Sequence, residues 1–468
     1  MKSANTVILL LLLAVCPGSI SSQNATFVTR LDSKESIVRE FSENVFIVYN
    51  NDGTTGTINY IDLNTNIVIS ARVQPVDVAD FEIYAGTAYF CGTAFGTPIA
   101  GLFDIVDLFF GGGQIEYILM SNSIPCYPHP NEFDRITNLR KLEVMPVGTD
   151  RPHMIMIGEA QCTYPSISDS INRCIIDLYY DGSNWISAMS QAHDGIMYYD
   201  DVAVTDNYVV TAGHKHWAEG EYMVVFNRQT TGYQNIFHQT SGTLGAPSFT
   251  IPFYMAGGVS QYDPATDEEF LIEHIDGDLF ATVCHGTRYS GTTLYEGTVL
   301  NLYIASSSGM AVANRYMTPE HSKRYRGLKY NCKSNSLYLL PGQISTCPES
   351  YLEFVMDNAK PAVTGALQHT DLSLYSPSFT SLDASPLTLS PAIGQAILSG
   401  ESNGRLHLWR HLLSGNDECH LESDLPLDNM MRDIGQTDYT IFYNVSVQPF
   451  FSITPAIELD ELEIKCTN

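Results

Sequence analysis

The sequence predicts an all-β protein built from repeated four-stranded antiparallel units. The clearest unit begins at Asp200: an alternating run at 201–205 is followed by the turn Asp206-Asn207, a β-rich run at 208–213, a polar loop and a further β-rich run at 222–226. Short strands separated by Asx turns are typical of an antiparallel meander. The pattern recurs along the chain, and many of its second strands end in a glycine followed by a loop, as at Gly92, Gly158, Gly213, Gly286, Gly342 and Gly400.

The unit, with strands A, B, C and D in chain order, fits the sequence seven times between Glu35 and about His420. In the first and seventh copies, only strands B and C are well defined. The predicted strands lie at 45–49 and 56–61 in the first copy; 80–84, 88–92, 101–105 and 114–119 in the second; 141–144, 154–158, 174–178 and 185–187 in the third; 201–205, 208–213, 222–226 and 233–237 in the fourth; 270–272, 279–284, 298–302 and 311–313 in the fifth; 327–330, 336–340, 351–355 and 362–364 in the sixth; and 395–400 and 405–409 in the seventh.

Repeats of this kind, none of which buries both faces of its sheet alone, resemble a single seven-bladed β-propeller of four-stranded antiparallel blades. The resemblance is to the architecture. Leu406-His-Leu-Trp409 resembles the end of a WD-type repeat, but Arg410 stands where that motif has aspartate, and Tyr180-Asp-Gly-Ser-Asn-Trp185 lacks the spacing of a sialidase Asp box. Kelch double glycines are missing from the expected strands, so no specific family is identified.

The architecture implies one propeller domain at 23–438 and a C-terminal closing segment at 439–468. A propeller ring is closed by a strand from one terminus, which hides the edges of the terminal blades. The two candidates for that strand are the segment from Asn24 to Thr29 and the C-terminal segment.

Residues 1–22 have the layout of a cleavable signal peptide. Lys2 precedes an apolar run from Val7 to Val15, which is too short to span a bilayer and is followed by small residues, so we expect cleavage after Ser21 or Ser22. Cys16 stands in a weak lipoprotein-like context, because Val15 replaces a small residue and Pro17 follows, and we expect no lipid anchor there. No later stretch is apolar enough to cross a membrane. The chain is therefore expected to be secreted, or to reach the periplasm or cell surface.

The chain is strongly acidic, with 52 Asp and Glu against 24 Lys and Arg and a net charge of -28. Such a surface repels phosphate backbones and anionic membranes, which disfavours nucleic acid as a partner. Acidity also simply keeps an exported protein soluble. A carbohydrate or an extracellular protein is the expected partner.

Loss of Cys16 with the signal peptide leaves nine of the ten cysteines. Disulfides are favoured outside the cytosol, and Cys162 with Cys174 is the expected pair because they flank one loop between neighbouring strands. Cys91 and Cys284 occupy equivalent positions in two copies and are expected to be buried thiols. The sequons at Asn24 and Asn444 are potential glycosylation sites.

The long insertions fall on one predicted face, which carries the B–C loops and the D–A connections. The opposite face has short turns such as Asp206-Asn207 and Gly111-Gly-Gly113, which merely reverse the chain. The long loops are rich in aromatic and donor side chains, which suit sugar stacking or peptide capture, although long loops also collect such residues for packing on one another. The predicted ligand-binding residues, expected on one face around the mouth of the central channel, are His214, His216, Trp217, His285, Arg288, Tyr289, Arg324 and Tyr325.

Two histidines at alternate positions, His214 and His216, point the same way on an extended segment and suggest a metal, but no third ligand is identifiable. We therefore expect neither a metal nor a cofactor. Trp217 is expected to be the anchor of a ligand, with packing against the 240–268 insertion as its alternative role.

No catalytic motif is present: the sequence has no serine elbow, no phosphate-binding glycine loop and no HExxH. The paired carboxylates Asp200 and Asp201 would point to opposite faces of a strand. The sequence thus favours an exported ligand-binding or scaffold propeller. The alternative is a carbohydrate-active enzyme of the same fold, a polysaccharide lyase or glycoside hydrolase.

Overall fold

The structure is a computed structural model. Residues 1–24, which include the predicted signal peptide, lie outside the part that it describes. It describes residues 25–32, 35–52, 55–73, 76–120, 124–125, 133–148, 151–161, 171–191, 197–215, 221–228, 236, 247–251, 270–290, 293–306, 309–318, 325–341, 350–358, 361–371, 378–383, 396–411, 420–429, 436–439, 441–445, 447–461 and 463–467.

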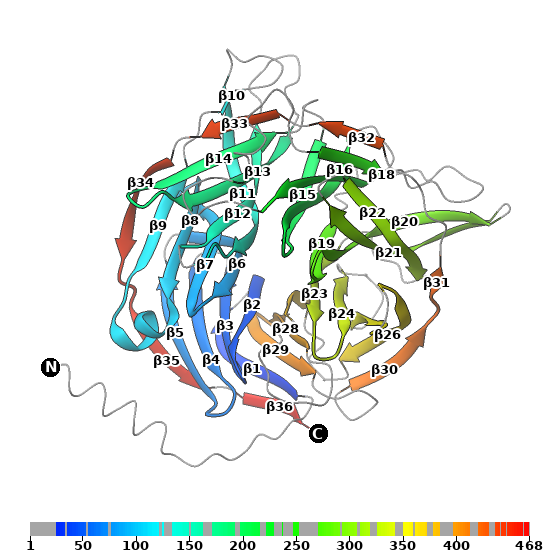
Figure 1. Cartoon of the computed structure of the whole chain (residues 1–468). Helices are drawn as coiled ribbons and strands as arrows, with labels where there is room; N and C mark the ends of the chain where they lie inside the picture. The colour runs from blue at the N-terminus through cyan, green and yellow to red at the C-terminus, as the bar shows by residue number, and fades with distance from the viewer. Residues whose placement is uncertain are drawn as a thin grey trace.

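Seven small antiparallel sheets stand in a ring, and the prediction of a seven-bladed β-propeller is confirmed (Figure 1). Each blade has its innermost strand at the centre of the ring. Blade 1 contains β2 (Glu35–Ser42), β3 (Val45–Asn51), β4 (Gly56–Asp62) and β5 (Ile67–Val73). Blade 2 contains β6 (Val76–Tyr84), β7 (Thr87–Ala94), β8 (Thr97–Asp104) and β9 (Ile115–Met120).

The next three blades follow the same order from the centre outward. Blade 3 contains β11 (Phe133–Met145), β12 (His153–Gln161), β13 (Ile171–Tyr180) and β14 (Trp185–Gln191), with the short β10 (Ile124–Pro125) beside β11. Blade 4 contains β15 (Met197–Val204), β16 (Tyr208–Lys215), β17 (Glu221–Asn227) and β18 (Pro247–Ile251). Blade 5 contains β19 (Leu271–Asp276), β20 (Leu279–Ser290), β21 (Thr293–Ser306) and β22 (Gly309–Thr318).

The N-terminal strand closes the ring. Blade 6 contains β23 (Tyr325–Asn331), β24 (Ser336–Pro341), β25 (Ser350–Met356) and β26 (Val363–Asp371). Blade 7 contains β27 (Ser378–Asp383), β28 (Ala396–Ser402) and β29 (Arg405–His411), and its fourth strand is β1 (Ala25–Asp32) from the other end of the chain. The segment that precedes blade 1 in the chain is therefore held in blade 7 by strand pairing.

The C-terminal segment forms a belt around the whole ring, and each of its seven strands pairs antiparallel with the outermost strand of a different blade. We call β30–β36 the C-terminal belt. It passes the blades in the reverse of chain order, from blade 6 to blade 1 and then to blade 7 (Figure 1). Its strands are β30 (His420–Leu425), β31 (Asp428–Asn429), β32 (Gln436–Tyr439), β33 (Ile441–Val445), β34 (Val447–Ile453), β35 (Ile457–Glu461) and β36 (Glu463–Thr467).

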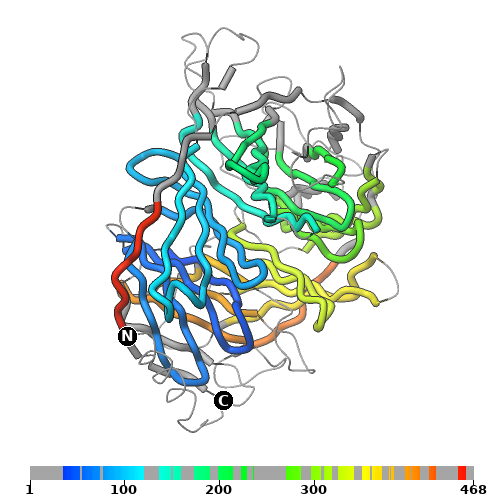
Figure 2. The backbone as a smooth tube through the Cα atoms, turned by 60° about the vertical axis from the view of Figure 1, so that its left-hand side comes forward, coloured from blue at the N-terminus to red at the C-terminus, as the bar shows by residue number. Residues whose placement is uncertain are grey.

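Sheet twist explains how one segment reaches all seven blades. Each strand is rotated relative to its neighbour, so the outermost strand of a four-stranded blade is strongly inclined to the innermost one. Figure 2 shows the red part of the belt passing from the outer strand of blade 2 to that of blade 1, where β34 pairs with β9 and β35 pairs with β5. The belt covers the outer edge of every blade, which would otherwise present unpaired backbone groups.

Apolar side chains fill every junction between neighbouring blades. Seven clusters of buried residues occur, one for each junction. Phe90 and Tyr117 of blade 2 pack with residues of blade 1, for example, and Trp409 of blade 7 packs with Tyr351 of blade 6. The two expected thiols, Cys91 and Cys284, lie buried in two of these clusters.

One sequence-based strand assignment was wrong, and one turn contains a helical element that was not predicted. The fourth strand of blade 4 is β18, not the predicted 233–237 run; Ile236 is instead buried in the junction of blades 3 and 4, where its N–H donates to Asp177 Oδ2 at 2.7 Å. The glycine-rich turn of blade 2 contains a single helical turn, η1 (Asp107–Gly111), which buries Leu108 and Phe109. In both places the chain leaves the sheet to bury apolar side chains.

Removal of the last two belt strands tests the edge-covering role. In a chain that ends after Thr454, β5 and β1 lose their outer partners, so we expect amide hydrogen exchange in these strands to become about tenfold faster or more. Strand β26, which keeps β30, serves as the internal control. Unchanged exchange in β5 and β1, measured by mass spectrometry, would contradict the proposed role.

Candidate functional site: the central channel

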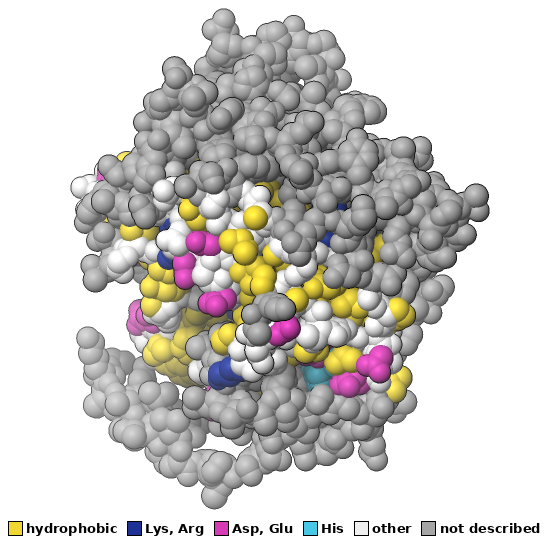
Figure 3. All heavy atoms as spheres, turned by 45° about the vertical axis from the view of Figure 1, so that its right-hand side comes forward, with side chains coloured by type: hydrophobic (Ala, Val, Ile, Leu, Met, Phe, Trp, Pro, Cys, Tyr) yellow, Lys and Arg dark blue, Asp and Glu magenta, His cyan; other side chains and the backbone are white. Residues whose placement is uncertain are grey.

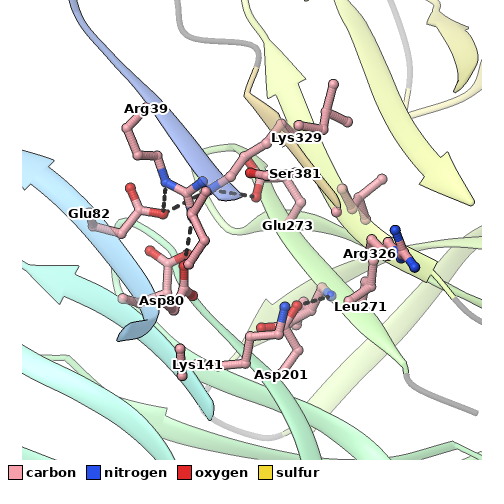
Figure 4. Close-up of a pocket in the computed structure, with 17 residues that line it drawn as sticks. Arg39, Asp80, Glu82, Lys141, Asp201, Leu271, Glu273, Arg326, Lys329 and Ser381 are labelled. Atoms are coloured by element: carbon pink, nitrogen blue, oxygen red, sulfur yellow. Dashed lines mark hydrogen bonds and ion pairs between the residues drawn. The ribbon is translucent and has the colours of Figure 1, made fainter. Parts of the chain in front are cut away.

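The innermost strands of the blades line a central channel with a cavity of about 110 Å³ (Figure 4). Its wall is charged. The acidic side chains of the wall are Asp80, Glu82, Glu143, Asp201 and Glu273, and the basic ones are Arg39, Lys141, Arg326 and Lys329. This site was missed by the sequence analysis, which looked for ligand-binding residues in loops.

Bulges in the inner strands place several of these side chains on the wall. The pairing of strands A and B slips by one residue immediately before Asp80, Lys141, Asp201 and Ser381. A bulge adds one residue to a strand and re-aims the side chains that follow. In these blades the residue before the bulge pairs with Gly92, Gly158, Gly213 or Gly400, the glycines that recur in the sequence.

Close backbone contact explains the glycine in blade 2. A Cβ atom at Gly92 would lie 1.9 Å from the carbonyl oxygen of Asp77, so no other residue fits without moving the backbone. The recurrent glycine therefore marks the bulge, and the bulge sets the direction of the channel-lining residue Asp80.

Arg39 of blade 1 is held by two acids of blade 2. Its Nη2 lies 2.8 Å from Asp80 Oδ1, and its Nε lies 3.0 Å from Glu82 Oε1. The side chain of Arg39 is only 9% exposed. Burial works against the charge of Arg39, but Glu82 and Asp80 outweigh it and raise the pKa of the guanidinium.

Lys329 reaches one of these acids, Glu82, from blade 6, across the channel. Its Nζ lies 3.0 Å from Glu82 Oε1 and 4.0 Å from Glu273 Oε2 (Figure 4). Burial opposes the charge of Lys329, but Glu82 and Glu273 raise its pKa well above the ordinary value. Burial alone would raise the pKa of Glu82, yet the two cations hold it below its usual range.

Each of the seven junctions between blades is bridged by a hydrogen bond or an ion pair. Each of these interactions uses a side chain and involves an inner strand. Between blades 1 and 2 the bridge is Arg39 with Asp80 and Glu82. The others are Leu142 N–H to Asp80 Oδ2 (3.2 Å), Arg173 to Asp200, Ile272 N–H to Asp201 Oδ2 (3.1 Å), Tyr330 N–H to Glu273 Oε1 (3.2 Å), Arg326 Nη1 to Phe379 O (2.6 Å), and, between blades 7 and 1, Val38 N–H to Ser381 Oγ (3.1 Å) and Glu40 N–H to Asp383 Oδ2 (2.6 Å).

Several channel acids hold a proton more tightly than usual. Burial raises the pKa of Glu273 to about 7, against the opposing effects of Lys329 and the Tyr330 N–H. Burial also raises the pKa of Asp201 to about 6, although Lys141 and two backbone N–H groups oppose it. The pKa of Glu143 is raised well above its ordinary value by burial, with Lys329 opposing. Of these carboxyl groups, Asp201 and Glu273 titrate near neutral pH.

Among the described residues, no group of three or more His, Cys, Asp or Glu side chains converges closely enough to hold a metal ion. The channel acids come from blades 2, 3, 4 and 5, so their charges are distributed around the wall.

The predicted ligand-binding residues are placed only in part by the structure. His214 lies near the end of β16, and Arg288 and Tyr289 lie near the end of β20. His216, Trp217 and Arg324 lie outside the described residues, so their proposed roles stay predictions.

Tyr325 and His285 lie at one junction, between blades 5 and 6. Tyr325 is buried at the start of β23, and its hydroxyl forms a hydrogen bond of 2.8 Å with Thr298 Oγ1 and lies 3.5 Å from the carbonyl oxygen of Cys284. His285, the next residue, is half-buried. Tyr325 thus packs inside the protein and fixes the base of the β20–β21 hairpin.

The predicted disulfide and sequons stay predictions. Cys174 is buried on β13, where its thiol lies 3.5 Å from Gly158 O, while Cys162 lies outside the described residues. Asn444 lies on β33 of the belt, and Asn24 lies outside the described part. In the described part no helix is both long and apolar enough to span a membrane.

Comparisons with known proteins identify no family for this chain. No protein-family model matches the chain, and no curated protein matches it significantly. Among solved structures, Hsv2 of Kluyveromyces lactis, with its complete loop 6CD, is similar with a TM-score of 0.39 and 10% sequence identity; the match covers 85% of this chain and 99% of that chain. Nothing about the ligand of this protein follows from that similarity.

The Arg39 bridge gives a direct test of how the blades are held together. In Arg39→Met, Asp80 and Glu82 lose a buried partner, and we expect the free energy of unfolding to fall by about 3 kcal/mol or more. The control is Arg72→Met, because Arg72 and Glu458 form an exposed pair, 58% and 55% exposed, whose loss is expected to cost less than about 1 kcal/mol. Equal losses for the two variants in urea denaturation would contradict the role given to Arg39.

Proposed function

We propose that this chain is an exported binding propeller that captures an extracellular carbohydrate or protein on the face of its B–C loops. A projecting arm in blade 5 is the observation that supports the proposal. Strands β20 and β21 have 12 and 14 residues, and they pair with each other up to Ser290 and Thr293. In Figure 1 this hairpin extends away from the ring.

The distal part of the arm is a two-stranded ribbon. Strand β19 pairs with β20 only as far as Val283, and β22 pairs with β21 only from Thr298 onward. The residues between, 284–297, pair only with each other among the described strands. A two-stranded ribbon gains little stability from burial by itself, so its length favours a role in contacting a partner.

Three of the predicted ligand-binding residues, His285, Arg288 and Tyr289, belong to this arm. Arginine and tyrosine are enriched where protein surfaces bind partners, because they combine a large contact area with hydrogen bonding. Their place on the arm supports a binding role for the blade 5 loop. Figure 3 shows several acidic side chains on the described part of one face. The net charge of the chain is -28, which favours neutral or cationic partners.

A carbohydrate-active enzyme is the second candidate, and one observation favours it. Glu273, whose pKa burial raises to about 7, has the protonation behaviour of a general acid. However, Glu273 and Asp201 each accept a backbone N–H from the next blade, which gives both a structural task. Propellers support binding and catalysis alike, so the fold does not separate the two.

Shortening the arm tests the binding role. Replacement of residues 286–297 by Asn-Gly leaves His285 and Thr298 paired across a two-residue turn and is expected to preserve the fold. We expect about a tenfold or greater loss of affinity for ligands found on glycan and extracellular-protein arrays. Tyr84→Ala, an exposed site at the end of an inner strand of blade 2, is the control and should bind as the unmodified protein does.

Two results would contradict the binding proposal. Retained affinity in the shortened variant would remove the arm from the site. Formation of new reducing or unsaturated ends on a polysaccharide would support the carbohydrate-active enzyme instead of the binding protein.

Export is a separate part of the proposal, and it rests on residues 1–22. Expression in a secreting host should yield protein in the medium whose N-terminus, read by mass spectrometry, is Ser22 or Gln23. An intact Met1 on cell-retained protein would argue against export, and a lipid on Cys16 would show that the chain is anchored.

A further inference from the structure

The channel wall carries more acidic than basic groups directed at the cavity. Arg326 lines the cavity, but its guanidinium is directed away from Arg39 and Lys329 (Figure 4) and donates to Phe379 O in the next blade. The five acids of the wall therefore face three cations, Arg39, Lys141 and Lys329. When all five acids are ionised, two negative charges of the wall are left without a matching positive charge.

Glu143 stands apart from the other acids of the wall. Asp80, Glu82, Asp201 and Glu273 each bind a cationic side chain or a backbone N–H, as described above. Glu143 is half-buried on the cavity wall and has neither a hydrogen bond nor an ion pair with any described residue, although Lys329 attracts its charge from a distance. A carboxylate on this wall without a hydrogen-bond partner is costly to ionise, and a bound cation would relieve that cost.

We propose that the central channel binds a short alkyl diamine, with one ammonium group at Glu143 and the other among the acids of blades 4 and 5. Two excess charges match a dication, and their distribution over several blades matches two separated ammonium groups better than one metal ion. The alkyl chain would lie against the apolar part of the wall, which includes Ile37, Leu271 and Leu328.

The size of the cavity agrees with such a ligand. At about 110 Å³, it has room for a few water molecules, each of which occupies about 30 Å³ in the liquid, or for a short alkyl chain in their place. The side chains of Glu82 and Glu273 retain 18% and 16% exposure, so solvent reaches this part of the wall.

Binding should weaken as pH falls. The channel acids that titrate near neutral pH are Asp201, which faces Lys141 and Asp80, and Glu273, which faces Lys329 and Glu82. Both also lie near Glu143. A cation favours their ionised form, which predominates above their pKa values of about 6 and about 7. Affinity for the diamine is therefore highest above about pH 7 and is lost below about pH 6. The ammonium groups of the ligand, like that of lysine, stay protonated over this whole pH range.

Calorimetric titration of the full mature chain with 1,4-diaminobutane tests this assignment. We expect saturable one-to-one binding at about pH 8 and at least about tenfold weaker binding at about pH 5.5, at equal ionic strength. 1-Butylamine has the same carbon chain with one ammonium group and should bind at least about tenfold more weakly.

Glu143→Gln is the decisive variant, because Glu143 takes part in none of the seven blade bridges and its loss should leave the fold intact. We expect about a tenfold or greater loss of diamine affinity, and no change in Glu43→Gln, which alters an exposed residue in the β2–β3 turn. Absence of binding to the unmodified chain, equal binding by Glu143→Gln, or equal binding of butylamine would each overturn the assignment. The arm-shortened variant should bind the diamine normally, which separates this inference from the loop-face proposal.

Discussion

The structure depends on how seven separate sheets are held side by side. No β-ladder joins neighbouring blades in the described part of the chain, so side chains supply most of their cohesion. Apolar clusters fill each junction, and near the axis a polar or charged side chain bridges each one. Burial of apolar surface provides most of the free energy, but it is non-directional. The bridges, such as the Ile272 N–H on Asp201, fix the distance and angle between inner strands.

The bridges also determine the chemistry of the channel. A carboxylate that accepts an N–H from the next blade must sit on an inner strand, and seven inner strands converge on one axis, so the bridging groups gather there. Arg39 and Lys329 compensate part of this negative charge through Asp80, Glu82 and Glu273. Glu143 is the exception, because it contributes charge without bridging a junction. A structural solution to blade packing thereby creates a polar cavity that is ready for a cationic ligand.

The sequence was sufficient for most of the blades because all but blade 7 are local meanders whose turns and strand patterns lie within about 40 to 60 residues. It was insufficient for the features that link distant segments. The belt strands are short, from two residues in β31 to seven in β34, and their partners lie up to several hundred positions away, as for β35 and β5. The sequence does contain a weaker indication of the channel. Charged residues alternate with apolar ones in predicted A strands, as in Asp80-Phe-Glu82 and Lys141-Leu-Glu143, and this alternation places the charged side chains on one side of the strand. The recurrent glycine is visible in the sequence, but only the register of strands A and B in the structure shows that it lies opposite a bulge.

The ring is closed twice, and the two closures act at different radii. Strand β1 completes blade 7 and joins the ends of the blade series, whereas the belt follows the outer rim and pairs with every blade, ending on β1 itself. Opening of any one junction would therefore strain belt connections on both sides of it. Such a ring is a rigid support, and a rigid support lowers the entropic cost of presenting a loop to a partner. The belt runs along the outer rim and the channel along the axis, so the blade 5 arm can vary in length and sequence without disturbing either. This separation is why the arm and the channel can be expected to bind different ligands independently.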